Sequence, residues 1–198
     1  MIGKVLDARV IAGAATLVLI VLAPRHAAAI DTIIGGQAEI CARDAKADIF
    51  TPEAIETCSI ALTTEVLQGH LLAATYVNRG TMFIGAANYG SALKDFDEAI
   101  KAEPGLGVAY VNRGGALVGL RRYKEAEAEI DKGLALMPEE PEKAYGNRAI
   151  ARWSQDNVKG AYEDFIKALE LKPDWAWPKE QLTHFTVSGQ AKPANPAP

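Results

Sequence analysis

A five-residue phrase that recurs at a nearly fixed interval is the feature that most constrains this chain. YVNRG occupies residues 76–80 and returns at 110–114, and the related YGNRA occupies 145–149. The copies are therefore 34 and then 35 residues apart. A period of this size is typical of solenoids, in which each unit buries its apolar face against the next. The chain is expected to be an array of similar units.

The rest of each interval repeats in register. Three units at 74–107, 108–141 and 142–175 each open with a tyrosine and close with a proline. Within each unit, apolar residues recur three and four positions apart in two segments, as in ALKDFDEAI of the first unit. This spacing predicts two amphipathic helices per unit, with the proline ending the second. The extra residue of the last interval falls in PEEPEK at 138–143, a turn that can absorb it.

The tyrosines, glycines, alanines, aromatic residues and prolines of residues 74–175 together resemble the tetratricopeptide repeat family. The resemblance implies an all-α fold, a right-handed α-solenoid of antiparallel helix pairs with a capping helix. With a partial unit ahead of the three clear ones, the array has about three and a half repeats. The resemblance also implies that the chain binds proteins or peptides and has no catalytic activity.

One face of each first helix is predicted to pack on the second helix. Tyr76, Gly80 and Phe83 lie within one stripe of a helical wheel. Glycine inside a helix costs about 1 kcal/mol relative to alanine, so Gly80 is expected where the second helix comes close. In the third unit Arg152 takes the place of Phe83. Either its stem packs and its head reaches water, or it pairs with an acid.

The opposite face of the first helices is expected to line a concave groove. Asparagine recurs there once per unit, and an amide can both donate and accept hydrogen bonds, so a ladder of amides can hold the backbone of an extended peptide. The alternative is that each asparagine only bonds the neighbouring helix. The candidate groove residues are Val77, Asn78, Thr81, Val111, Asn112 and Asn147.

Two further observations concern charge in the repeats. The arginines of the recurring phrase lie on a flank of the first helix and are expected to pair with acids of the second helices, or with helix-end carbonyls; binding of an acidic ligand is the alternative. They are Arg79, Arg113 and Arg148, with Asp95, Glu129 and Asp164 as partners. Some family members grip a terminal carboxylate with lysine and asparagine on the first helix. Val77 and Thr81 hold those places here, so this clamp is absent and the groove floor is small and neutral.

The N-terminus has the organisation of a secretory signal. Lys4 and Arg9 precede an apolar run at 10–23, and small residues follow Pro24 at 27–29. The run is shorter than the roughly 20 residues of a membrane span. We interpret residues 1–29 as a cleaved signal peptide, with an uncleaved anchor as the alternative. The mature protein is then expected in the periplasm or outside the cell, without a membrane span.

Residues 30–72 are interpreted as a degenerate first repeat that carries both cysteines. Thr51 and Pro52 are suited to begin a helix and Gly69 to end it. Cys41 and Cys58 are expected to form a disulfide in an oxidising compartment, worth about 3 kcal/mol; two buried free thiols are the alternative. The arrangement resembles exported tetratricopeptide proteins of Gram-negative bacteria, in which a cysteine pair precedes the repeats.

A short capping helix is predicted at 176–187, beginning near Pro178. Trp175 and Trp177 would cover the last repeat, or alternatively line a ligand site. The Pro/Ala-rich tail at 188–198 is expected to be disordered.

Composition and motifs exclude several functions. The net charge of −4, without a run of Lys or Arg, argues against a nucleic-acid partner. The histidines are isolated, which argues against a metal site, and neither a phosphate loop nor a nucleophile elbow is present. No enzyme activity or cofactor is expected. The leading hypothesis is a peptide-binding scaffold of the bacterial cell envelope; a structural or self-assembly module, or an accessory subunit of an envelope complex, is the alternative.

Overall fold

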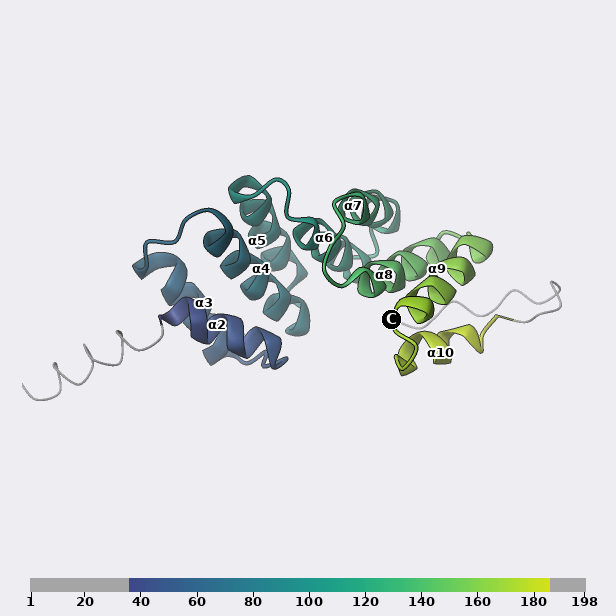
Figure 1. Ribbon diagram of the computed structural model, residues 1–198, viewed down its shortest axis with the longest axis horizontal. Helices are drawn as coiled ribbons and strands as arrows, with labels where there is room; N and C mark the ends of the chain where they lie inside the picture. Colours follow the sequence, from purple (N-terminus) through teal and green to yellow (C-terminus); the bar gives the residue numbers. More distant parts are fainter. Residues whose placement is uncertain (1–35, 186–198) are drawn as a thin grey trace, which may run out of the picture.

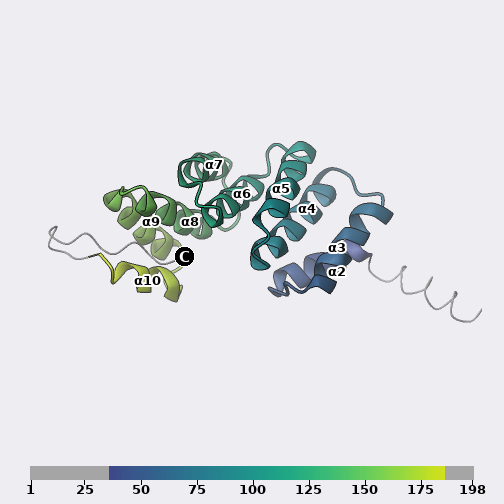
Figure 2. The same cartoon turned by 180° about the vertical axis from the view of Figure 1, so that it is seen from behind.

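The computed structural model describes residues 36–185; the predicted signal peptide at 1–29 and the tail at 188–198 lie outside them. In this part of the chain there are nine α-helices and no strands, and successive helices stack side by side in an all-α solenoid (Figures 1 and 2). The helices are α2 (Gln37–Lys46), α3 (Pro52–Thr64), α4 (Gly69–Gly85), α5 (Tyr89–Ala102), α6 (Gly107–Gly119), α7 (Tyr123–Ala135), α8 (Pro141–Ser154), α9 (Val158–Leu171) and α10 (Ala176–Leu182).

Local signals set the ends of the second helices α5 and α9. The side chains of Asn88 and Asn157 accept hydrogen bonds from backbone N–H groups three residues later, at 3.2 and 3.1 Å. Both helices end where an extended residue precedes a proline. Helix α7 ends differently, because Leu136 stays near helical geometry and Met137 takes a left-handed backbone, with φ 52°. The backbone conformation of the α7–α8 connection therefore differs from that of the connections after α5 and α9.

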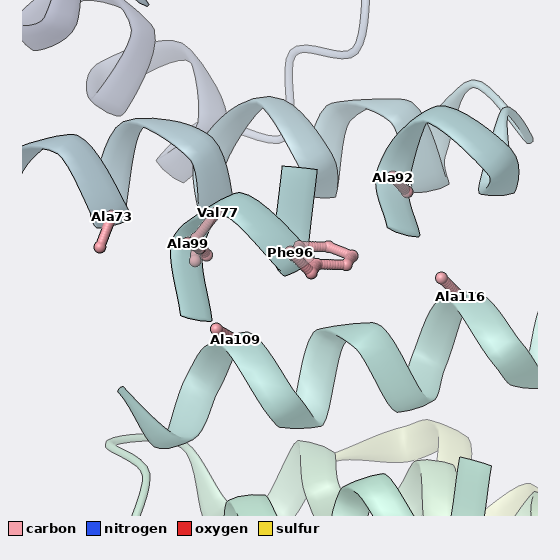
Figure 3. Packing of buried hydrophobic residues seen from close by; sticks show 7 residues of the cluster. All are labelled: Ala73, Val77, Ala92, Phe96, Ala99, Ala109 and Ala116. Carbon is pink, nitrogen blue, oxygen red and sulfur yellow. The ribbon is translucent and has the colours of Figure 1, made fainter. Parts of the chain in front are cut away.

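The core confirms why glycine recurs in the first helices. A Cβ atom on Gly80 would lie 2.6 Å from a ring carbon of Phe96, and one on Gly114 would lie 2.4 Å from Ile130. Figure 3 shows Phe96 among the small residues of α4, α5 and α6. The helices approach so closely that only a residue without a side chain fits against these groups.

The arginines of the recurring phrase form a ladder of ion pairs, as predicted. Each donates two hydrogen bonds to an acid on the second helix of its own unit and one to the second helix of the preceding unit. Each guanidinium also lies 5.2–5.9 Å from the centroid of the tyrosine that opens its unit. The rungs are Arg79 with Asp95 and Ser59, Arg113 with Glu129 and Asp97, and Arg148 with Asp164 and Asp131.

The arginine and carboxylate side chains of these ion pairs favour their charged forms. The hydrogen bond to Asp95 raises the pKa of Arg79 despite the opposing effect of burial. Burial alone would raise the pKa of Glu129, but hydrogen bonds from Lys132 and Arg113 outweigh it and lower that pKa. In the third unit Arg152 pairs with Glu127 at 2.8 Å and with Asp164 at 3.0 Å. Of the two environments predicted for this arginine, pairing with an acid is the one observed.

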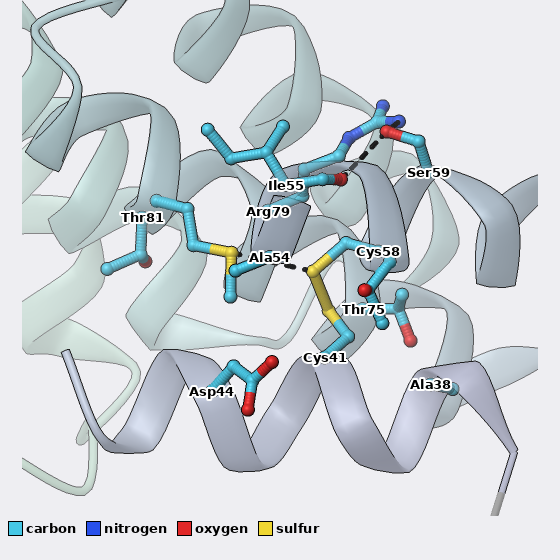
Figure 4. The surroundings of a disulfide bond; sticks show 12 residues. Ala38, Cys41, Asp44, Ala54, Ile55, Cys58, Ser59, Thr75, Arg79 and Thr81 are labelled. Atoms are coloured by element: carbon cyan, nitrogen blue, oxygen red, sulfur yellow. Dashed lines mark hydrogen bonds between the residues drawn. A yellow bond between two sulfur atoms is a disulfide. The ribbon is translucent and has the colours of Figure 1, made fainter. Parts of the chain in front are cut away.

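The first helix pair is joined covalently. Cys41 of α2 and Cys58 of α3 form a disulfide, with 4.9 Å between their Cα atoms. Figure 4 shows the bond between the two labelled cysteines. Both residues are fully buried, and the Sδ atom of Met82 on α4 lies 3.6 Å from the sulfur of Cys58. The disulfide thus holds the two helices of this pair together. In the next pair, the close packing of Gly80 against Phe96 is found between the corresponding helices.

The prediction that Gly69 ends α3 was wrong. Helix α3 ends at Thr64, and Gly69 begins α4 with φ 52°. The reason is Glu65, whose backbone turns extended while its carboxylate accepts hydrogen bonds from the first N–H groups of α2, those of Gln37 and Ala38. A carboxylate at this position satisfies donors that would otherwise be unpaired.

The last helix covers the end of the array. Helix α10 begins at Ala176, slightly before the predicted start near Pro178. Trp177 packs edge-on against Phe165 of α9, with 5.6 Å between ring centroids. A Cβ atom on Gly146 of α8 would lie 3.0 Å from Trp177 and 3.1 Å from Trp175. Both indoles therefore pack against the third unit, as expected of a cap.

Candidate functional site

Two adjoining cavities lie along the first helices of the pairs. The larger, of about 570 Å³, is bounded by α2, α4, α6 and the start of α8. The smaller, of about 340 Å³, is bounded by α4, the start of α6 and the α7–α8 connection. We call their union the groove. It is continuous because the cavities share Val77, Asn78, Val108, Pro138, Glu139 and Glu140.

Alanine and valine line much of the groove, Leu106, Leu136 and Met137 also line the smaller cavity, and no Phe, Tyr or Trp lines either cavity. Val77 and Val111, which were predicted to face the groove, do line it. They are nevertheless 7% and 2% exposed, because the first helices are packed against neighbours on both sides. The floor is formed by Ala42, Ala45, Ala74, Val77, Val108 and Val111.

The three asparagines of the predicted ladder have different environments. Asn78 lines both cavities, and within residues 36–185 its amide has no hydrogen-bond partner. Asn112 lines the larger cavity, and its Nδ2 donates to the hydroxyl of Thr81 at 3.1 Å. Asn147 lines neither cavity. Of the three amides, that of Asn78 is the one that lines the groove with all of its hydrogen-bonding capacity available.

The difference follows from the residue that each asparagine covers. Thr81 and Gly115 occupy the same position in successive units, three residues after the asparagine. Asn112 lies over Thr81, which supplies an acceptor. Asn147 lies over Gly115, where a Cβ atom would be 3.2 Å from its Nδ2 and there is no hydroxyl. The predicted alternative, a bond to the neighbouring helix, therefore holds for Asn112.

Charged residues at the groove edges were not among the predicted site residues. Glu139 and Glu140 of the α7–α8 connection line both cavities. Glu140 accepts a hydrogen bond from Lys143 at 2.7 Å, whereas Glu139 has no ion-pair partner in the described part of the chain. Lys46 and Asp48 line the α2 end. The extra residue in the last repeat interval was the available signal, because it marks the connection that carries the two glutamates.

Two other features are absent from residues 36–185. These residues contain no group of three or more His, Cys, Asp and Glu side chains that could hold a metal ion. No helix among them has the length and apolarity needed to cross a membrane.

Comparison with known proteins identifies the fold. A family model described as tetratricopeptide repeat matches residues 142–174, the predicted third unit. The Arabidopsis OM64 TPR domain is 26% identical, with a TM-score of 0.52, and the match covers 57% of this chain and 94% of that one. Residues 142–174 therefore match a tetratricopeptide repeat, and the helical array has the fold of tetratricopeptide repeat domains. No curated protein matches the sequence.

Two other solved structures show what this tetratricopeptide chain is similar to. The second TPR domain of the human RPAP3 protein, in complex with the HSP70 peptide SGPTIEEVD, is 25% identical with a TM-score of 0.52; the match covers 58% of this chain and 94% of that one. The MamA RS-1 ArsTM double mutant is 20% identical with a TM-score of 0.58, covering 75% of this chain and 83% of that one. The latter likeness concerns the fold alone.

Proposed function

We propose that this tetratricopeptide chain is a non-catalytic scaffold of the bacterial cell envelope that holds an extended segment of a partner protein in the groove. The observation that carries the proposal is the continuous groove with the free amide of Asn78 at its centre and Asn112 beside it. The peptide complex of the similar human domain supports a peptide as the ligand class.

The groove suits recognition of a peptide backbone. The amide of Asn78 offers two donors and an acceptor, which match the N–H and C=O groups of an extended chain. Asn112 keeps its acceptor and one donor hydrogen, because one hydrogen is used on Thr81. The aliphatic floor can take small apolar side chains of the ligand, whose burial contributes about 25 cal/mol per Å² of apolar surface.

A location in the periplasm or outside the cell is part of the proposal. The buried disulfide supports it, because such bonds persist in oxidising compartments and are rare in the cytosol. The signal-like sequence at 1–29 is consistent with export. Mass spectrometry of the protein recovered from the periplasmic fraction of a bacterial host tests both points: we expect a chain that begins near Ile30 with no free thiol.

The groove function is tested by substitution of the amides. Peptides selected on the mature protein from a random display library serve as ligands, with binding measured by fluorescence anisotropy. We expect Asn78→Ala to weaken binding roughly fivefold, the effect of one or two lost hydrogen bonds. The melting temperature should stay nearly constant, because this amide has no partner within the described residues.

Asn147→Ala is the matched control, since it removes the same amide from outside the groove and should leave peptide affinity unchanged. Thr81→Val separates the two roles of Asn112, because it removes the interhelix acceptor while keeping the amide. If Asn78→Ala and Asn147→Ala bind peptides equally well, the amides do not form the binding site.

A further inference from the structure

We infer that the groove selects an extended segment that carries a basic residue and rejects an acidic one. The inference rests on the proposed groove function and names the chemistry of the partner. It is carried by the distribution of charge around the groove, where carboxylates are available and nearly every cation is already paired.

The carboxylates are concentrated at the α7–α8 connection. Glu139 and Glu140 are exposed, adjacent in sequence, and line both cavities. They immediately precede Pro141, the first residue of α8, where the helix dipole favours negative charge. Glu140 forms an ion pair with Lys143. Glu139 has no such partner in residues 36–185 and is therefore an unpaired carboxylate that lines both cavities. Asp48 is a second carboxylate without a partner in residues 36–185, at the α2 end.

All but one of the cations that could receive an acidic ligand already have an acidic partner. No arginine lines either cavity. The three arginines of the recurring phrase are held by their acids, with side chains only 15–19% exposed. His70 lies 2.8 Å from Glu103, and Lys143 is bound to Glu140. Lys46 is the one groove cation without an ion-pair partner in the described chain, and Asp48 lines the same end.

These charges define the ligand. The alanine and valine residues, with Leu106, Leu136 and Met137 of the smaller cavity, can accept apolar side chains of the segment. Where it passes Glu139, a lysine or arginine would find an unpaired carboxylate. An acidic segment such as the EEVD end of the peptide bound by the human RPAP3 domain would instead meet two glutamates. Like charges placed together weaken association and slow it.

A series of three peptides tests the inference on the mature protein. A parent sequence is taken from the display selection, and its central position is set to Lys, Gln or Glu. We expect the Lys peptide to bind about tenfold more tightly than the Glu peptide, with Gln between them, which corresponds to one attractive against one repulsive surface pair. The advantage should shrink as salt is raised, because exposed charges are screened.

A charge-matched pair of variants locates the effect. Glu139→Gln with Glu140→Gln should remove most of the difference between the Lys and Glu peptides. Glu163→Gln with Glu170→Gln changes the net charge equally on exposed residues of α9 away from the groove, and should keep the difference. Equal affinity of all three peptides, or tighter binding of the Glu peptide, overturns the inference while leaving the groove function standing. If no selected peptide responds to Asn78→Ala, the groove function itself fails and this inference with it.

Discussion

At the scale of single residues, the arginine ladder links each repeat to its neighbour. One guanidinium reaches an acid on its own second helix and a polar group on the preceding one, and it also packs over a tyrosine ring. The acids are nearly buried: the side chains of Asp95 and Asp164 are 5% and 4% exposed. A buried carboxylate that loses its partner is strongly destabilising, so the rungs set the geometry between units as well as contributing to stability.

The rungs differ in a way that mutation should reveal. Arg79→Met leaves Asp95 without a partner and should lower the free energy of unfolding by roughly 3 kcal/mol. Arg148→Met should cost less, because Arg152 still donates to Asp164 at 3.0 Å. Urea denaturation of both variants measures the difference. Arg79→Met combined with Asp95→Leu should recover much of the loss, and equal losses for the two single variants would contradict this account.

At the scale of helices, the disulfide compensates for a poor core. Helix α2 has ten residues, and only Ala38 and Cys41 among them are buried. A helix that buries so little apolar surface gains little stability from the hydrophobic effect. Its position depends on the bond to Cys58 and on Glu65, which caps its N-terminus. Because α2 supplies one wall of the groove, the same bond holds that wall in place.

Removal of the bond should therefore loosen the first pair. Cys41→Ala with Cys58→Ala should lower the free energy of unfolding by about 3 kcal/mol, the value expected for a loop of this length. Urea denaturation followed by circular dichroism measures it, with hydrogen exchange to locate the change in α2 and α3. An unchanged urea midpoint would mean that packing alone holds α2.

The helices could be predicted from the sequence because their signals are periodic. The 34-residue interval, the glycines opposite Phe96 and Ile130, and the arginine partners all follow from spacing on a helical wheel. The end of α3 could not, because it depends on Glu65 reaching α2 across the molecule. The groove edge was missed for the same kind of reason: Glu139 and α2 line one cavity because of how the whole array is arranged, which no local pattern encodes.

At the scale of the molecule, contacts between helices are confined to near neighbours in the array. Helices contact those next to them or one position beyond, and α2–α3 and α10 stand at opposite ends in both views (Figures 1 and 2). Stability in such an array is close to a sum of terms for each unit and each junction. A change at one end should therefore be felt locally.

Trp177→Ala tests this locality. The half-buried indole packs on Phe165, so its loss should cost roughly 2 kcal/mol, less than for a fully buried aromatic residue. Hydrogen exchange should accelerate in α8, α9 and α10 and stay unchanged in α2 and α3. Equal acceleration throughout would show that the described chain unfolds as a single cooperative block.

The enclosed disulfide also fixes an order of events in the making of the protein. Both sulfur atoms are shut away from solvent, with Met82 of the first full repeat closed over one of them. Because an oxidant cannot reach the thiols in the folded state, we expect the bond to form before α4 packs against α3. After closure the same burial keeps reducing thiols out. The N-terminal end of the array therefore points to folding under oxidising conditions, in keeping with the proposed location.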